Sequence, residues 1–359
     1  MSIPGAVATA LGRRGRDGVV VGEVAQAHDG SLGTAHAYVD AIAAAGADAV
    51  KFQIHLPNAE STREEPWRVP FSRQDDSRYD YWARTGFTSD QWTGLGDHAR
   101  DAGLALVCSP FSVEAVGVAE SMGVDAVKVA SGEVASHDLL EAAASLSVPV
   151  LLSSGMSTYA ELDAAVEVLR RSDAHLAILQ CSSTYPCPPE EVGLNVMSEI
   201  RARYRCEVGL SDHSGTVYPS LAALTLGASV VEVHVTLSRE SFGPDVTSSV
   251  TTAELATLCD GATWISTMAR HPLDKDRAAA AREDVRVIFS RSLVARTALP
   301  AGHILSEGDL AAKKPGGGLP LGARESLVGG RLTRPLAADE QVQPTDVEMA
   351  AAPPRQPEP

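Results

Sequence analysis

Residues 124–156 read VDAVKVASGEVASHDLLEAAASLSVPVLLSSGM. The stretch begins with a valine-rich run (124–130), continues through an Ala- and Leu-rich segment with helical spacing (136–146), and ends in a second apolar run (148–153). Short β-branched runs favour strands, and an amphipathic segment between them favours a helix. A strand, a helix and a second strand in this order predict a βαβ unit with two parallel strands.

The same alternation continues from about residue 19 to residue 270. The short apolar runs predict eight strands, at 19–24, 48–54, 104–108, 124–130, 148–153, 175–181, 206–210 and 229–236. Helices are expected between them, for example at 34–45, 89–102, 136–146, 158–171, 216–227 and 251–269. Eight such units predict an α/β fold, a parallel (β/α)8 TIM barrel. A doubly wound open sheet is the alternative, but no GxGxxG follows the first strand.

Composition divides the chain into further segments. They are an N-terminal extension (1–18), the barrel domain (19–270), a charged linking helix (271–290), a small, mostly β module (291–348) and a tail expected to be disordered (349–359). Within the barrel, the long gap at 55–87 is rich in Arg, acidic and aromatic residues. It follows the second strand, on the face where barrel enzymes carry their active sites. The gap is therefore either a lid or a simple excursion over the surface.

The charge and hydropathy of the chain exclude several classes of protein. Its 359 residues include 30 basic and 46 acidic ones, which give a formal net charge of -16. Such a field repels nucleic acid and anionic membranes, although a local basic pocket can still hold an anionic metabolite. The mean hydropathy is -0.02, and no apolar run approaches the about 18 to 20 residues of a membrane span.

Two further features indicate a cytoplasmic protein. Arg13, Arg14 and Arg16 follow the Ala-rich N-terminal stretch, whereas in a secretory signal the basic residues come first. The five cysteines are odd in number and include no CxxC or zinc-ligand spacing, so reduced and mostly buried thiols are expected.

Lysine is scarce in this sequence, and two lysines fall inside predicted strands. Only five of the 30 basic residues are lysines, and Lys51 and Lys128 belong to strands that should be buried on both faces. An unpaired buried ammonium is costly, so both residues need a functional or structural reason. A compact ammonium group suits phosphate contact or imine chemistry.

Other polar residues end the predicted strands, where barrel enzymes place catalytic groups. In chain order they are Glu23, Lys51, Gln53, Ser109, Lys128, Ser131, Glu133, Ser153, Ser154, Ser182, Ser183, Tyr185, Ser211, Asp212, His213 and His234. Two ammonium groups and many hydroxyls converging on one face predict a phosphate site. A strand-end serine taken alone is most often a helix cap.

Two histidines occupy equivalent positions on consecutive strands, so His213 and His234 should be neighbours in space. Paired imidazoles with open positions suit Mn²⁺ or Zn²⁺, whereas each histidine alone is more typical of a hydrogen-bonded core residue. The acidic residues Glu23, Glu133, Asp212 and Asp245 could bind sugar hydroxyls, orient histidines or transfer protons. Helix capping is the alternative for Asp212 and a turn for Asp245.

Six ordered motifs together resemble the sialic acid synthase family, the phosphoenolpyruvate-dependent synthases of nonulosonic acids. The motifs are Val50-Lys51-Phe52-Gln53, Ser109-Pro110-Phe111, Lys128-Val129-Ala130-Ser131-Gly132-Glu133, Ser153-Ser154-Gly155-Met156, Cys181-Ser182-Ser183-Thr184-Tyr185-Pro186 and Gly209-Leu210-Ser211-Asp212-His213-Ser214-Gly215. The C-terminal module, with Arg291-Ser292-Leu293-Val294-Ala295 and Lys314-Pro315-Gly316, resembles the antifreeze-like (SAF) domain.

The resemblance implies a metal-dependent condensation of phosphoenolpyruvate with an open-chain amino sugar aldehyde, with release of phosphate. His213 and His234 would hold Mn²⁺ or Mg²⁺. The other roles that it implies fall into three sets: phosphoenolpyruvate binding by Lys51, Ser109, Lys128, Ser131, Ser153 and Ser211; completion of that pocket by Gln53, Glu133, Ser183 and Tyr185; and sugar contact by Glu23 and Asp245, with Glu23 a candidate for proton transfer. Members are homodimers in which one subunit's SAF domain covers the other's barrel.

Departures from the family pattern fall at positions expected to lie near the acceptor sugar. Lys314 stands where the SAF domain normally presents an arginine, and Ser183 replaces an asparagine. We therefore expect a retained reaction with a shifted acceptor sugar. Two other functions stay open: a class I aldolase with a Schiff base on Lys51 or Lys128, and a non-catalytic carbohydrate-binding descendant of the synthase.

Overall fold

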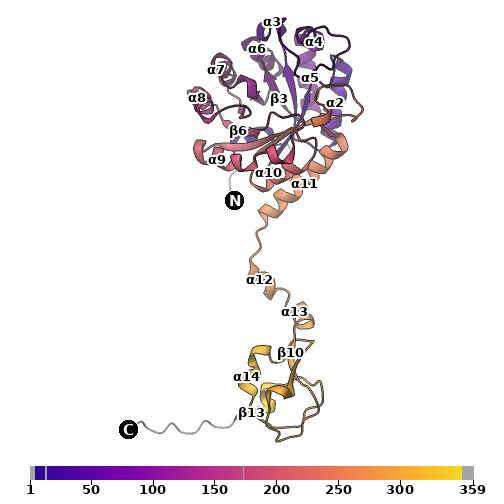
Figure 1. The fold of residues 1–359 in the computed structure, drawn as a ribbon, viewed down its shortest axis with the longest axis vertical. Coiled ribbons are helices and arrows are strands. Elements are labelled where there is room, and N and C mark those ends of the chain that lie inside the picture. The colour runs from indigo at the N-terminus through magenta and orange to yellow at the C-terminus, as the bar shows by residue number, and fades with distance from the viewer. Residues whose placement is uncertain (1–4, 13, 173, 350–359) are drawn as a thin grey trace, which may run out of the picture. The chain divides into compact units, whose positions relative to one another are not determined.

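The computed structural model describes residues 5–12, 14–172 and 174–349, and Figure 1 shows its elements. The chain divides into two compact units, one up to His271 and one from Pro272 onward. No helix in the described part of the chain has both the length and the apolar character that a bilayer crossing requires.

The first unit is a closed barrel of eight parallel strands. In order these are β1 (Val19–Ala25), β2 (Ala49–Ile54), β3 (Ala105–Pro110), β4 (Ala126–Val129), β5 (Val150–Ser153), β6 (Leu176–Cys181), β7 (Glu207–Asp212) and β8 (Val230–Thr236). Each strand pairs with the next, and β8 pairs back onto β1, which excludes the open sheet. A short strand β9 (Val250–Thr251) adds to β8 beyond the barrel. The predicted (β/α)8 barrel is confirmed.

Helices surround the strands as the βα alternation predicted (Figure 1). They are α2 (Leu32–Ala44), α5 (Ser89–Asp101), α6 (Val113–Met122), α7 (His137–Ser145), α8 (Tyr159–Leu169), α9 (Leu194–Tyr204), α10 (Tyr218–Thr225) and α11 (Thr252–Arg270). Threonines at 88, 158 and 251 begin α5, α8 and α11 with capping boxes, which satisfy the free N–H groups of the first turn. Apolar helix faces and strand side chains form one continuous core between the two layers.

The N-terminal extension contributes a helix to the barrel. Helix α1 (Ala6–Leu11) buries Val7 and Leu11 completely. Both side chains join a cluster of small apolar residues from the strands, which includes Val19, Ala49 and Val230. Because these residues lie at the starts of their strands, α1 closes the end of the barrel opposite the strand C-termini.

The long segment after β2, residues 55–87, contains two short helices, α3 (Pro57–Glu60) and α4 (Arg78–Thr85). Its aromatic residues pack on one another: the Phe71 ring lies 5.1 Å from Tyr81, and the Trp67 ring 5.4 Å from Phe71. The segment therefore has a small aromatic cluster of its own.

The second unit begins with two short helices, α12 (Lys275–Ala280) and α13 (Glu283–Phe289), where the sequence predicted one linking helix. Glu283 and Asp284 begin the second helix, where its N-terminal dipole favours negative charge. The module after them contains the antiparallel pairs β10 (Ser292–Ala295) with β11 (Leu310–Lys313) and β12 (Arg331–Leu332) with β13 (Val347–Glu348).

A short helix α14 (Arg324–Leu327) completes the module. Leu293, Leu310 and Leu332 belong to a buried cluster confined to this unit. The predicted small, mostly β domain after the barrel is confirmed. The predicted disordered tail lies, beyond Met349, outside the described residues.

Candidate active site

The floor of the barrel pocket contains two lysines that share one carboxylate. Glu232 Oε1 lies 3.0 Å from Lys128 Nζ and 3.4 Å from Lys51 Nζ. Lys51 Nζ also lies 3.0 Å from Glu23 Oε2. All four side chains are buried. The lysines are thus both paired, as the cost of a buried ammonium demands.

Strand register brings these groups together. Glu23 lies beside Lys51 across the β1–β2 pair, and Ser211 lies beside Glu232 across β7–β8. Glu232 is a site residue that the sequence analysis missed. It precedes His234 by two positions on β8, so both side chains point to the same face of the strand. This spacing from His234 is the sequence feature that could have identified Glu232.

Burial and charge shift the pKa values of the two carboxyls in opposite directions. Burial raises the pKa of Glu23 well above its ordinary value, and the charge of Lys51 only partly offsets this. Burial also opposes the ionisation of Glu232, but Lys128 and Lys51 together outweigh it and hold the pKa of Glu232 below its ordinary value. Glu232 is therefore the permanent negative charge of the floor, and Glu23 is the group suited to exchange a proton.

Hydroxyl groups surround the ammonium groups. Lys51 Nζ donates to Ser109 Oγ over 3.2 Å, and Ser211 Oγ donates to Glu232 over 3.0 Å. Gly155 lets the hydroxyls of Ser131 and Ser183 approach its backbone closely, because a Cβ at this position would lie only 2.6 Å from both oxygens. Ser153 also lines the pocket. Ammonium groups and hydroxyls around an open cradle can bind a carboxylate and a phosphate.

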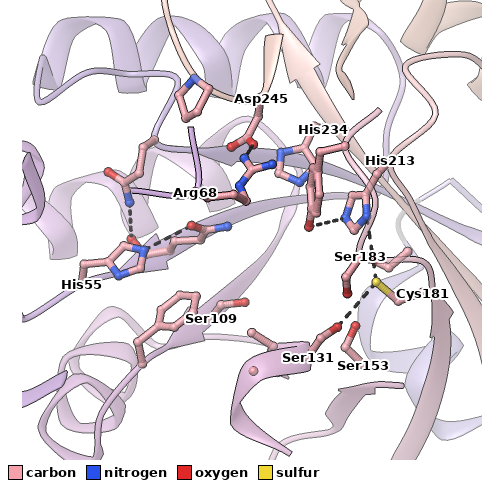
Figure 2. A pocket seen from close by; sticks show the side chains of 18 of the residues that line it. His55, Arg68, Ser109, Ser131, Ser153, Cys181, Ser183, His213, His234 and Asp245 are labelled. Carbon is pink, nitrogen blue, oxygen red and sulfur yellow. Dashed lines mark hydrogen bonds and ion pairs between the residues drawn. The ribbon is translucent and has the colours of Figure 1, made fainter. Parts of the chain in front are cut away.

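The histidine pair lies at one side of this cradle, as Figure 2 shows. The ring centroids of His213 and His234 are 5.3 Å apart, so the predicted proximity is confirmed. His213 Nδ1 lies 2.8 Å from the carbonyl oxygen of Ser182, and Nε2 lies 3.0 Å from the hydroxyl of Tyr185. The carbonyl requires the proton on Nδ1, so the lone pair of Nε2 accepts from the Tyr185 hydroxyl.

The two imidazoles fit a divalent cation with open coordination positions. A backbone carbonyl behind one ring nitrogen is the usual support of a metal-binding histidine. His234 makes no side-chain hydrogen bond within the described ranges, and burial lowers its pKa to about 4, so its ring is neutral at pH 7. In the described residues no group of three or more His, Cys, Asp or Glu could hold a metal. The remaining ligands would have to be substrate or water.

Cys181 lies between the histidine pair and the hydroxyls. Its Sγ is 3.9 Å from His213 Nδ1 and 3.6 Å from Ser131 Oγ. Burial opposes its ionisation, but His213, Lys128 and Ser131 together outweigh burial and lower the thiol pKa to about 7. The cysteine was assigned no role from the sequence beyond its place in a motif.

The mouth of the pocket is built from the long segment after β2. Arg68 is a second residue that the sequence analysis missed: its Nη2 lies 2.5 Å from Asp245 Oδ1, and its guanidinium lies 4.3 Å from the Tyr185 ring centroid. The segment also lines the mouth with Trp67, Val69, Phe71, Arg78, Tyr81 and Trp82. It is a wall of the site and not a simple excursion over the surface.

A chain of hydrogen bonds connects this segment to the floor. Gln53 Nε2 donates to Glu23 Oε1 over 2.7 Å, and His55 Nε2 lies 3.2 Å from Gln53 Oε1. His55 Nδ1 lies 2.6 Å from Glu60 Oε1, and its ring stacks on Trp82 at 3.7 Å between centroids. Gln53 is therefore held in one orientation, with its amide N–H toward Glu23.

Most of the predicted site residues surround one pocket. Those that line it are Lys51, Gln53, Ser109, Lys128, Ser131, Ser153, Ser183, Tyr185, Ser211, His213, His234 and Asp245. Glu23 lies behind Lys51 and Gln53 and is not exposed.

Glu133 is outside the lining and accepts a hydrogen bond from Ser136. Lys314 belongs to the second unit, where its Nζ lies 5.2 Å from the Phe289 ring centroid. Asp212 accepts from Ser214 N and Ser220 Oγ, but it does not cap helix α10, whose N-cap is Val217.

Comparison with known proteins gives consistent matches over nearly the whole chain. Residues 38–272 match the NeuB family, and residues 290–348 match the SAF domain. The N,N'-diacetyllegionaminic acid synthase of Campylobacter jejuni is 31% identical over 90% of this chain and 98% of its own length. Human N-acetylneuraminate-9-phosphate synthase is 28% identical and covers 80% of each chain.

A solved structure agrees with these relatives. The N-acetylneuraminic acid (sialic acid) synthetase of Leptospira borgpetersenii, in complex with citrate, superposes with a TM-score of 0.65 at 25% identity. The match covers 74% of this chain and 90% of that one.

Proposed function

The chain belongs to the NeuB family and is an enzyme of the sugar acid synthase class, and from that premise we propose that it condenses phosphoenolpyruvate with an open-chain amino sugar aldehyde. The product would be a nonulosonic or related 3-deoxy-2-keto sugar acid, together with inorganic phosphate. One observation carries the proposal: two buried lysines and a cradle of serines lie beside a histidine pair in one pocket.

Phosphoenolpyruvate would occupy the floor. Lys51, Lys128 and the hydroxyls of Ser109 and Ser211 would neutralise and orient its carboxylate and phosphate. The hydroxyls of Ser131 and Ser183, which line the pocket, would bind one of these two groups. Holding the enol carbon of phosphoenolpyruvate toward the acceptor turns a bimolecular step into one between bound groups.

The acceptor would lie between the histidines and the mouth, with its aldehyde near His213 and its hydroxyls near Asp245. We propose Mn²⁺ or Mg²⁺ at His213 and His234. When bound there, the cation would polarise the aldehyde oxygen of the acceptor.

The overall reaction consumes one molecule of water. C3 of phosphoenolpyruvate attacks the aldehyde carbon, a C–C bond forms, and the aldehyde oxygen takes a proton. Water adds at C2, and cleavage of the C2–O bond releases phosphate. Glu23, with its raised pKa, is the candidate that accepts the proton of this water. It is linked to the pocket by its contacts with Lys51 and Gln53. The Tyr185 hydroxyl, which bonds to Nε2 of His213, would have to release that nitrogen for the cation to bind there.

The remaining expectations from the family are also proposals. They are a cytoplasmic homodimer in which one subunit's SAF domain covers the partner's barrel, Lys314 as the SAF residue that approaches the acceptor, and Glu133 as part of the phosphoenolpyruvate pocket. The replacement of the usual arginine by Lys314 loses a planar fork of donors. A shift in acceptor preference is the expected consequence.

A Schiff-base aldolase is a weaker candidate. A lysine must lose its proton to attack a carbonyl. Burial opposes the charge on Lys51, but Glu23 and Glu232 outweigh it and raise the pKa of Lys51. Lys128 is paired with Glu232 over 3.0 Å. Both ammonium groups are arranged to bind anions, which favours the synthase.

The test is phosphate release from phosphoenolpyruvate with Mn²⁺ across a panel of aldoses. The panel contains N-acetylmannosamine, N-acetylmannosamine 6-phosphate, mannose, mannose 6-phosphate and 2,4-diacetamido sugars. We expect release with at least one sugar and its loss in EDTA. Phosphoenolpyruvate binding without release would favour a non-catalytic descendant, and absence of phosphoenolpyruvate binding would contradict the proposal. Trapping of pyruvate by borohydride would establish the aldolase instead.

A further inference from the structure

Arg68 reaches the active site from an unexpected part of the chain. It lies in the loop between α3 and α4, and its guanidinium contacts two residues of the site, Asp245 and Tyr185. Asp245 itself lies in the loop that follows β8. Figure 2 shows Arg68 directed toward Asp245 beside His234. The ion pair therefore joins two loops across the mouth of the pocket.

Arg68 has donors left for a ligand. A guanidinium carries five N–H groups. Among the residues that the structure describes, Asp245 is the single acceptor that hydrogen-bonds to it, and the side chain remains 39% exposed. Because Arg68 lines the pocket, a molecule that enters the mouth meets its unused N–H groups before it reaches the floor.

Each guanidinium of the mouth has a carboxylate of its own, whereas the two ammonium groups of the floor share Glu232, and burial raises the pKa of the other floor carboxyl, Glu23. Arg68 is paired with Asp245, and Arg78 is paired with Glu65 over 3.0 Å. A phosphate bound by Arg68 would lie next to the Asp245 carboxylate, and like charges at that distance repel. An acyl carbonyl or hydroxyl oxygen accepts from the guanidinium without this repulsion. The two ammonium groups that suit an anion lie on the floor.

We propose that Arg68 binds the acceptor sugar through an uncharged oxygen, so that the enzyme selects an unphosphorylated acceptor over its phosphate. This proposal rests on the proposed function and assigns specificity within it. The guanidinium carbon lies over the Tyr185 ring, 4.3 Å from its centroid, and the Tyr185 hydroxyl bonds to His213. An acceptor held by Arg68 is therefore placed next to the histidine pair.

The experiment compares Arg68→Ala and Arg68→Lys with Arg63→Ala in the full-length enzyme. Arg63 is a matched control from the same segment: it also pairs with a carboxylate, Asp80, and stacks on a ring, Tyr79, but its side chain is 73% exposed and outside the pocket. Phosphate release is measured against the concentration of each substrate, with N-acetylmannosamine and its 6-phosphate among the acceptors. A thermal shift with phosphoenolpyruvate reports folding and an intact floor.

We expect Arg68→Ala to raise the acceptor KM about 10- to 100-fold, the value of a lost hydrogen bond to a charged group. The phosphoenolpyruvate KM should change less than about threefold, since that substrate binds the floor. Arg68→Lys should recover part of the loss, and Arg63→Ala should match the wild type. Wild-type enzyme should prefer the unphosphorylated acceptor.

Three results would overturn the proposal. They are an unchanged acceptor KM in both Arg68 variants, an equal rise in the KM values of both substrates, and a wild-type enzyme that takes the phosphorylated acceptor in preference. Each requires an active wild-type enzyme. Complete absence of phosphate release in the wild type is a different result, because it contradicts the proposed function itself.

Discussion

Glu232 forms ion pairs with two ammonium groups in the floor of the pocket. Its Oε1 lies within 3.4 Å of both Lys51 and Lys128 and accepts from Ser211 as well. The second oxygen, Oε2, is buried without a hydrogen-bond partner in the described part of the chain. A carboxylate so placed keeps the lysines charged while the pocket is empty of anions, and it leaves them free to bind one.

Replacement of Glu232 by glutamine keeps the shape of the side chain and removes its charge. Breaking one side of a buried ion pair typically costs about 3 to 5 kcal/mol, because the remaining charge stays buried. We expect the free energy of unfolding of Glu232→Gln to fall by about this amount in urea titrations. Phosphoenolpyruvate or inorganic phosphate restores negative charge beside the lysines, so either anion should raise the melting temperature of the variant more than that of the wild type.

Glu254→Gln is the matched control for this prediction. Glu254 pairs with Arg239 on the surface, where its side chain is 41% exposed. Exposed pairs contribute at most about 1 kcal/mol, and glutamine preserves the capping box that Glu254 forms with Thr251. Equal stability of the two variants would show that the lysines do not depend on Glu232.

Residue chemistry explains what the sequence could predict of the site. Lys51 and Lys128 were identifiable because a polar residue in a strand buried on both faces needs a reason to be there, and His213 and His234 because they occupy equivalent positions on consecutive strands. Arg68 carried no such signal, since an arginine in a polar loop is ordinary on any surface. Its place in the mouth depends on how the loop packs, and one-dimensional spacing does not contain that information.

At the scale of elements, helix α1 acts as a plug for the barrel. Its Val7 and Leu11 fill the end of the barrel opposite the pocket, and the backbone N–H of Val7 donates to Glu207 on β7 over 2.9 Å. Barrel interiors are packed cores, so an end that is not closed exposes apolar side chains to water. The extension therefore stabilises the barrel from outside its βα repeat.

We expect Leu11→Ala to lower the free energy of unfolding by about 2 to 5 kcal/mol, the usual cost of truncating a fully buried leucine. Phosphate release at 25 °C should keep its kcat, because the substitution lies at the far end of the barrel from the site. Urea unfolding and steady-state kinetics measure the two effects separately.

Leu226→Ala is a suitable control, since Leu226 is 54% exposed and should lose less than about 1 kcal/mol. A Leu11 variant as stable as this control would mean that α1 is dispensable for the barrel. A large loss of kcat at unchanged stability would contradict the structural role given to the helix.

Element boundaries were predictable where a repeating pattern marked them. Runs of Val, Ile and Leu marked all eight strands within a few residues, because a parallel barrel buries its strands on both faces. Helix α1 and the split of 271–290 into α12 and α13 escaped, since neither repeats the βα pattern. The start of α13 at Glu283 depends on a local charge preference that a periodicity search does not weigh.

Among the described residues, the two buried apolar clusters of the barrel share no residue with the cluster of the second unit, so the two units have separate cores. Leu293 is fully buried in the second core, so Leu293→Ala should destabilise the unit from Pro272 onward by about 2 to 5 kcal/mol. Separate cores predict two calorimetric transitions, of which Leu293→Ala lowers one and Leu11→Ala the other. The double variant should show both shifts with additive size. A single transition lowered by either substitution would show instead that barrel and SAF module unfold as one cooperative unit.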